Sequence, residues 1–124
     1  MKSLMLALLI VVTTAATADA NWRLYRKDKE VVASFDYLSR TSFRGQPAIR
    51  ARWHYVVPRN GVGGVKLQFT ADCSARKLFE IEALPYDVSG NYITARKRTR
   101  YDAPKEYPLT PGSLNEATYK LLCR

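Results

Sequence analysis

The stretch AIRARWHYVV, residues 48–57, decides the fold. Its apolar and polar residues alternate one by one, and this two-residue period places them on opposite faces of a β-strand. One set contains Ile49, Ala51, Trp53, Tyr55 and Val57, and the other contains Arg50, Arg52 and His54. The sequence therefore predicts a strand with one apolar face on a core and one cationic face open to water.

The same alternation continues in the next two segments. Residues 65–72 and 79–83 each alternate apolar and polar side chains, and both read as strands. The links, residues 58–64 and 74–76, are short enough to form hairpins. These segments therefore predict antiparallel neighbours of the first strand.

In the hairpin around residues 74–76, one strand register places the apolar residues of both strands on the same face. A slip of one residue would turn the apolar residues of one strand toward water. The favoured register pairs Cys73 with Lys77, Ala71 with Phe79, Phe69 with Ile81 and Leu67 with Ala83. Glu80 and Glu82 then share the opposite face, where we expect them to meet lysines or arginines across the sheet.

Further strands are predicted over residues 22–26, 31–37 and 92–100, and the C-terminal end changes to a helical period. Ser113 and Glu116 form a capping box before a helix from residue 114 to about 123. Its apolar stripe consists of Leu114, Ala117, Thr118, Leu121 and Leu122. The predicted fold class is mainly β (α+β): a single antiparallel sheet of about six strands in a meander, with the C-terminal helix packed on one face.

Composition limits the chain to one domain and gives it a strong positive charge. The 124 residues contain 20 Lys and Arg against 11 Asp and Glu, for a net charge of +9. This composition excludes a disordered acidic tail, a collagen-like chain and a multi-span membrane protein. We expect a single domain over residues 21–124.

Residues 1–20 have the order of a secretory signal peptide. Lys2 precedes an apolar run over residues 4–12, and the segment ends on Ala18-Asp19-Ala20. The apolar run is too short to span a membrane, which needs about 20 residues. We therefore expect an exported protein, periplasmic or secreted, with no membrane span after cleavage. Asn21 rather than a lipid-accepting cysteine follows the predicted cut.

The two cysteines, Cys73 and Cys123, fit one disulfide, because export brings the chain into an oxidising compartment. A metal site is the competing interpretation, but these cysteines and the lone His54 lack the short ligand spacing of structural zinc sites. On a regular helical wheel Cys123 lies away from the apolar stripe. The last helical turn must therefore tilt or fray for Cys123 to reach Cys73.

The chain after residue 20 resembles the bacterial surface-adhesin protein E family along nearly its whole length. The features that carry the resemblance are Trp22, the segment VVASFDYLSR at residues 31–40, the strand ending in Asp72-Cys73 and the segment PGSLNEATYKLLC at residues 111–123. The resemblance implies an antiparallel sheet with a C-terminal helix tethered by a Cys–Cys bridge. It also implies attachment to host matrix proteins such as vitronectin and laminin. The leading hypothesis is therefore an exported, non-enzymatic binding protein.

The segment RKRTR, residues 96–100, points to a second function. It contains Arg96, Lys97, Arg98 and Arg100, and an extended chain would place its three arginines on one side about 6.6 Å apart. Arginine binds phosphate and sulfate through its planar fork. Together with Arg50 and Arg52, these residues are the candidates for binding a polyanion: lipopolysaccharide, glycosaminoglycan or nucleic acid. The competing interpretation is that the charge keeps an edge strand from pairing with other chains.

The sequence offers no catalytic set. His54 is the only histidine, and no phosphate-binding loop, metal site or cofactor motif is present, so we expect neither an enzyme nor a small-molecule cofactor. A basic secreted nuclease would lack its second histidine. An inhibitor of a secreted hydrolase is a further alternative, which the charge disfavours because lysozymes are themselves basic.

Overall fold

The computed structural model describes residues 21–124, so the predicted signal peptide lies outside the described residues. A six-stranded antiparallel path runs through the sheet in sequence order, as the meander predicted. Its strands are β1 (Trp22–Lys27), β2 (Val31–Asp36), β4 (Gln46–Arg59), β5 (Val62–Asp72), β6 (Lys77–Asp87) and β7 (Arg98–Thr99). Two short strands lie off this path: β3 (Thr41–Phe43) pairs with β4, and β8 (Lys105–Tyr107) pairs with β6.

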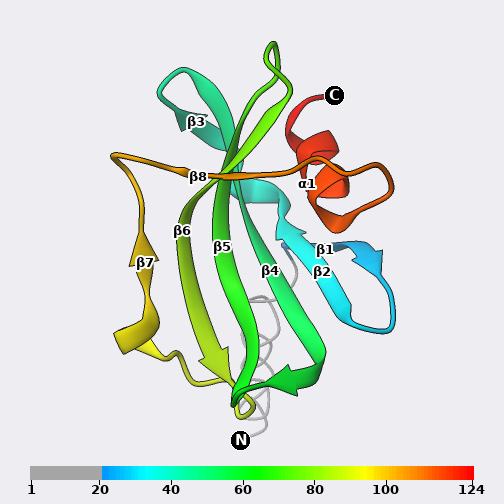
Figure 1. Cartoon of the computed structure of the whole chain (residues 1–124), viewed down its shortest axis with the longest axis vertical. Coiled ribbons are helices and arrows are strands. Elements are labelled where there is room, and N and C mark those ends of the chain that lie inside the picture. Colours follow the sequence, from blue (N-terminus) through cyan, green and yellow to red (C-terminus); the bar gives the residue numbers. More distant parts are fainter. Residues whose placement is uncertain (1–20) are drawn as a thin grey trace, which may run out of the picture.

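The helix α1 (Leu114–Leu122) lies across the upper part of the sheet, and the segment carrying β8 crosses the long strands beside it (Figure 1). Two 3-10 turns, Tyr37–Ser39 and Thr94–Arg96, complete the described elements. We call the side of the sheet that carries α1 the inner face and the opposite side the outer face. The predicted fold class is confirmed.

The core forms where the alternating strands face α1. Ile49 opposes Phe69 and Ala51 opposes Leu67 across β4 and β5, and all four are buried. The polar residues between them point to the outer face, as the period predicts. The alternation of residues 48–54 therefore builds the core and a polar sheet face at the same time. The prediction is wrong for Val57, which is 69% exposed because the β4–β5 register shifts after His54.

The helix begins and ends as its sequence predicts. The Ser113 side chain accepts a hydrogen bond from the Glu116 amide, and the Glu116 carboxylate accepts one from the Gly112 amide, at 3.2 and 3.0 Å. Thr118, Leu121 and Leu122 of the predicted stripe are buried. Tyr119 was not in that stripe, yet it too is buried, and its hydroxyl donates to the Cys73 carbonyl at 3.2 Å.

The Cys73–Cys123 disulfide joins the end of the helix to the turn after β5, which confirms the predicted bridge. The helix ends at Leu122, and Cys123 follows with φ −119° and ψ 83°, outside helical geometry. This departure from the helix lets the Cys123 sulfur reach Cys73, as the position of Cys123 on the helical wheel required.

The predicted register of β5 and β6 is wrong beyond Leu67. Leu67 opposes Ala83 as expected, but a β-bulge leaves Ile81 without a partner. The remaining pairs are Phe69 with Glu80, Thr70 with Phe79, Ala71 with Leu78 and Asp72 with Lys77. The extra residue reverses the faces of β6, so Glu80 lies on the inner face and Glu82 on the outer face.

The predicted strand over residues 92–100 is also wrong for most of its length. Tyr92 forms an isolated bridge to Tyr86, a 3-10 turn follows, and only Arg98–Thr99 is a strand. The Pro85 carbonyl accepts a hydrogen bond from the Ile93 amide, but proline has no N–H to donate in return. The ladder along this edge of β6 is therefore interrupted.

The predicted loop over residues 58–64 is shorter than expected. Asn60 and Gly61 alone make the turn, with φ of 51° and 78°. Asn-Gly is the sequence that favours two-residue hairpins with both φ values positive. The strands β4 and β5 are therefore longer than the alternation alone predicts.

Replacing both Cys73 and Cys123 by alanine should lower the free energy of unfolding by about 4 kcal/mol, because the bridge spans a sequence separation of 50 residues. Urea unfolding followed by tryptophan fluorescence measures this change. The parent protein treated with a reductant should show the same midpoint as the variant. An unchanged midpoint for the variant would show that the packing of α1, not the bridge, holds the helix.

Candidate functional site

Cations without acidic partners gather on the outer face of the two central strands. Arg52 of β4 lies directly opposite Lys66 of β5, and Arg50 lies two residues along the same strand. Like charges directly opposite each other destabilise a sheet. Among residues 21–124, no carboxylate lies within ion-pair distance of these three side chains. We call Arg50, Arg52 and Lys66 the outer cation cluster.

Aromatic rings flank the outer cation cluster. The Arg52 guanidinium lies 4.5 Å from the centroid of the Trp22 ring, and the Lys66 ammonium lies 5.9 Å from that of Tyr92. The side chains of Tyr92 and Tyr101 are about half exposed, at 50% and 45%. The cations are thus held against the half-buried Trp22 ring and the half-exposed Tyr92 ring, and the Tyr101 ring lies exposed beside them.

Two hollows lie on the outer face beside the cluster. One, of about 380 Å³, is lined by Val32, Ser34, Arg52, His54, Tyr86, Gly90 and Tyr92. The other, of about 270 Å³, is lined by Arg50, Lys66, Leu67, Gln68, Glu82, Leu84 and Tyr101. Arg52 lines the first, and Arg50 and Lys66 line the second. The cluster therefore connects two neighbouring depressions of the same surface.

His54 borders the first hollow and is held by Tyr86. Its Nδ1 lies 3.1 Å from the Tyr86 hydroxyl, and the two rings stack at 6.1 Å. Gly64 makes room for this contact, because a Cβ there would lie 2.2 Å from the same hydroxyl. His54 is thus oriented toward the hollow, as the alternation predicts.

The cationic run does not form one surface with Arg50 and Arg52. Lys97 pairs with Glu82 on the outer face at 3.6 Å, whereas Arg98 and Arg100 reach Glu80 on the inner face at 3.8 and 3.5 Å. Arg96 has no ion pair among the described residues. The six candidate cations are therefore divided between the two faces, and two of them serve a buried carboxylate.

Glu80 is the centre of a buried charged network. Its side chain has no exposed surface, and the Tyr107 hydroxyl of β8 donates a hydrogen bond to it. Burial raises the pKa of the Tyr107 phenol well above its usual range, and the hydrogen bond to Glu80 raises this pKa further. The Glu80 Oε2 and Arg100 Nε atoms are buried without hydrogen bonds and face each other at 3.5 Å. The network joins β6 to the segments that carry β7 and β8.

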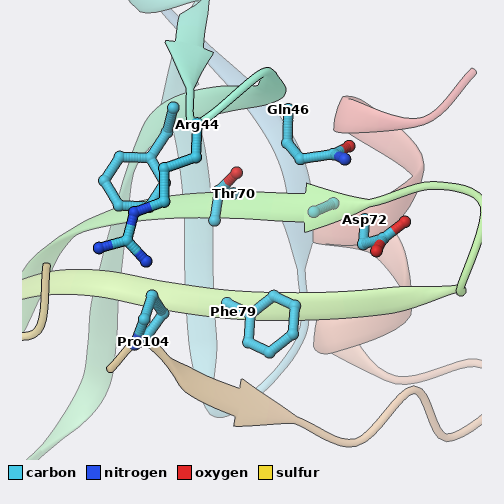
Figure 2. Close-up of a pocket in the computed structure, with 8 residues that line it drawn as sticks. Arg44, Gln46, Thr70, Asp72, Phe79 and Pro104 are labelled. Carbon is cyan, nitrogen blue, oxygen red and sulfur yellow. The ribbon is translucent and has the colours of Figure 1, made fainter. Parts of the chain in front are cut away.

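A third hollow, of about 220 Å³, lies between the β3–β4 hairpin, β5 and β6 (Figure 2). Thr70 and Phe79 line it, and Arg44 and Asp72 lie at its rim. Three of the polar groups there have partners within the chain: Thr70 donates to the Pro47 carbonyl, Arg44 to the Tyr101 carbonyl, and Asp72 accepts from the Ala75 amide. The Gln46 side chain also lines the hollow and has no hydrogen-bond partner among the described residues. This hollow therefore offers a ligand apolar contact and one amide side chain.

Sequence reasoning missed three residues of these sites. The alternation of residues 65–72 places Lys66 on the polar side of its strand, and only the β4–β5 register places it against Arg52. Trp22 meets Arg52 because β1, β2 and β4 are adjacent in the sheet. Glu80 was expected beside Glu82, and the bulge at Ile81, which has no periodic signature, separates them.

Glu80→Gln should lower the free energy of unfolding by about 2–3 kcal/mol, because Arg98 and Arg100 would lose the carboxylate that compensates them. Glu82→Gln, two residues along the same strand, is the matched control. It should cost less than about 1 kcal/mol, since the Glu82–Lys97 pair is partly exposed. Urea unfolding of both variants measures the difference. Equal losses would contradict a special role for the buried carboxylate.

Comparisons with known proteins assign no family and no function to the chain. No family model, no curated protein and no solved structure matches the chain. Within residues 21–124, no three His, Cys, Asp or Glu side chains come close enough together to hold a metal ion, and no helix is long and apolar enough to cross a membrane. The resemblance to surface-adhesin protein E, with the matrix partners that it implies, stays a prediction.

Proposed function

We propose that this chain binds a sulfated or phosphorylated polymer through the outer face of its sheet, centred on Arg50, Arg52 and Lys66. The observation that carries the proposal is the direct opposition of Arg52 and Lys66 with no described carboxylate within ion-pair distance of either. Glu82 lines the same hollow as Lys66, but it pairs with Lys97. A fold gains no stability from such a pair. A polyanion would supply the missing negative charge.

The spacing of the outer cation cluster suits an extended polymer. Arg50 and Arg52 are two residues apart on β4, which corresponds to about 6.6 Å along a strand. Lys66 lies across the gap between strands, about 4.8 Å wide. Three cations spread over this distance can each contact a different charged group of one polymer. A single compact anion is too small to contact all three.

The aromatic rings support the same ligand class. Proteins that bind single-stranded nucleic acids without sequence preference combine a cationic surface with aromatic side chains that stack on bases. Trp22, Tyr92 and Tyr101 surround the cluster in this way. Sugar rings of a glycosaminoglycan or lipopolysaccharide can lie on the same aromatic faces. The predicted export of the chain would bring it into contact with such polysaccharides.

The run at residues 96–100 contributes less to this surface than its sequence suggests. Arg98 and Arg100 compensate Glu80, and Lys97 compensates Glu82. Alanine at these positions would disturb the fold and the charge together. The outer cation cluster, which has no such pairs, is the sharper target for mutation.

The triple variant Arg50→Ala/Arg52→Ala/Lys66→Ala should elute from a heparin column at much lower salt than the parent protein. Its affinity for a single-stranded oligonucleotide should depend less on salt, with the slope of log K against log salt smaller by about 2, because each lost cation removes roughly 0.7 to 0.9 from the slope. Fluorescence anisotropy at several salt concentrations measures the slope.

The matched control replaces Lys29, Lys77 and Lys120 by alanine. It lowers the net charge by the same three units but removes exposed lysines away from the outer cation cluster. It should keep most of the retention of the parent protein. Equal losses in the two triple variants would reduce the interaction to net charge, and unchanged retention in the first would rule out the proposed surface.

A further inference from the structure

A separate groove lies on the inner face of the sheet, between the strands that carry Trp53, Val65 and Leu67 and the β8 residue Tyr107. Its volume is about 280 Å³. Its lining includes Trp53, Val65, Leu67, Arg96, Arg98 and Tyr107. This volume is close to the lower limit for small-molecule sites, about 300 Å³. The groove therefore has room for roughly ten groups of the size of a water molecule.

The groove is apolar along its floor and aromatic along its wall. Val65, Leu67 and Pro85 come from adjacent strands, and Trp53 and Tyr107 stand beside them with ring centroids 6.2 Å apart. Trp53 is held in place because its indole N–H donates to the Tyr25 hydroxyl at 2.8 Å. The lining contains no carboxylate and no amide side chain. A ligand rich in hydroxyl groups would find only the Tyr55 and Tyr107 hydroxyls as side-chain acceptors there.

Arginines form the other side of the groove, and one of them is oriented in advance. The Nε of Arg98 lies 3.8 Å from the Glu80 carboxylate, so this ion pair holds Arg98 beside the groove. Arg98 and Arg100 share the single charge of Glu80, which leaves one positive charge in excess. Arg96, which has no ion pair among the described residues, adds a second excess positive charge. Arg59 covers the Tyr55 ring at 4.5 Å and pairs with Glu30 outside the groove.

We propose that this groove binds a small apolar carboxylate, with the carboxylate on Arg96 and Arg98 and the apolar body over Val65, Leu67 and Trp53. The guanidinium groups supply charge-assisted hydrogen bonds, and the apolar floor supplies the area removed from water. The absence of amide and acidic groups from the lining favours this class over a charged sugar. The site is independent of the outer cation cluster, which lies on the other face of the sheet.

The two tryptophans allow a direct test, because Trp53 lines the groove and Trp22 lies by the outer cation cluster. In a ¹H–¹⁵N spectrum of the purified protein each indole N–H gives one peak, and Trp22→Phe assigns them. Titration with naphthalene-2-carboxylate should move the Trp53 peak to saturation with a Kd below about 1 mM. The neutral alcohol 2-naphthalenemethanol should bind at least roughly tenfold more weakly. A parallel titration with decanoate shows whether the preferred body is aromatic or a flexible acyl chain.

Arg96→Ala and Arg98→Ala should each weaken binding of naphthalene-2-carboxylate about tenfold. Arg96→Ala leaves the Glu80 network untouched, so it separates a loss of ligand contact from a loss of fold. Arg50→Ala, on the outer face, is the control and should bind like the parent protein. The proposal is overturned if both carboxylates leave the Trp53 peak unmoved up to roughly 5 mM, if the alcohol binds as tightly as the acid, or if only the Trp22 peak moves.

Discussion

The burial of Glu80 is the constraint on which the rest of this structure depends. A carboxylate without solvent exposure must be compensated, and here Tyr107, Arg98 and Arg100 provide the hydrogen bond and the positive charge. These three residues come from a stretch with little regular structure of its own. The carboxylate thus fixes the segments after β6 to the edge of the sheet, where the interrupted ladder gives them few backbone hydrogen bonds.

This network also decides which cations are available for function. Arg98 and Arg100 are drawn to the inner face, where one of them also lines the groove beside Trp53. Arg50, Arg52 and Lys66 remain on the outer face without acidic partners. The excess charge of the sequence is therefore divided between two surfaces of different character: a broad outer face suited to a polymer, and a small inner groove suited to a compact apolar anion.

The sequence predicted much of this structure wherever a local period governs it. The alternation of residues 48–57 placed Arg50, Arg52 and His54 correctly, and the capping box placed the helix. The prediction failed at Ile81, because the alternation of residues 79–83 has no break, and the stabilisation of an inward Glu80 comes from residues about 20 to 30 positions away. Lys66 and Trp22 could not be assigned to the site from local pattern, since their positions depend on strand register and strand order.

The division of the cations can be measured directly through the Nε–H resonances of the arginine side chains, which report each guanidinium separately. On addition of a heparin oligosaccharide, the resonances of Arg50 and Arg52 should shift, whereas that of Arg100, whose Nε is buried against Glu80, should stay in place. Shifts of Arg98 and Arg100 with Arg50 and Arg52 unmoved would contradict the account, because the polymer would then be bound by the run that the structure ties to Glu80.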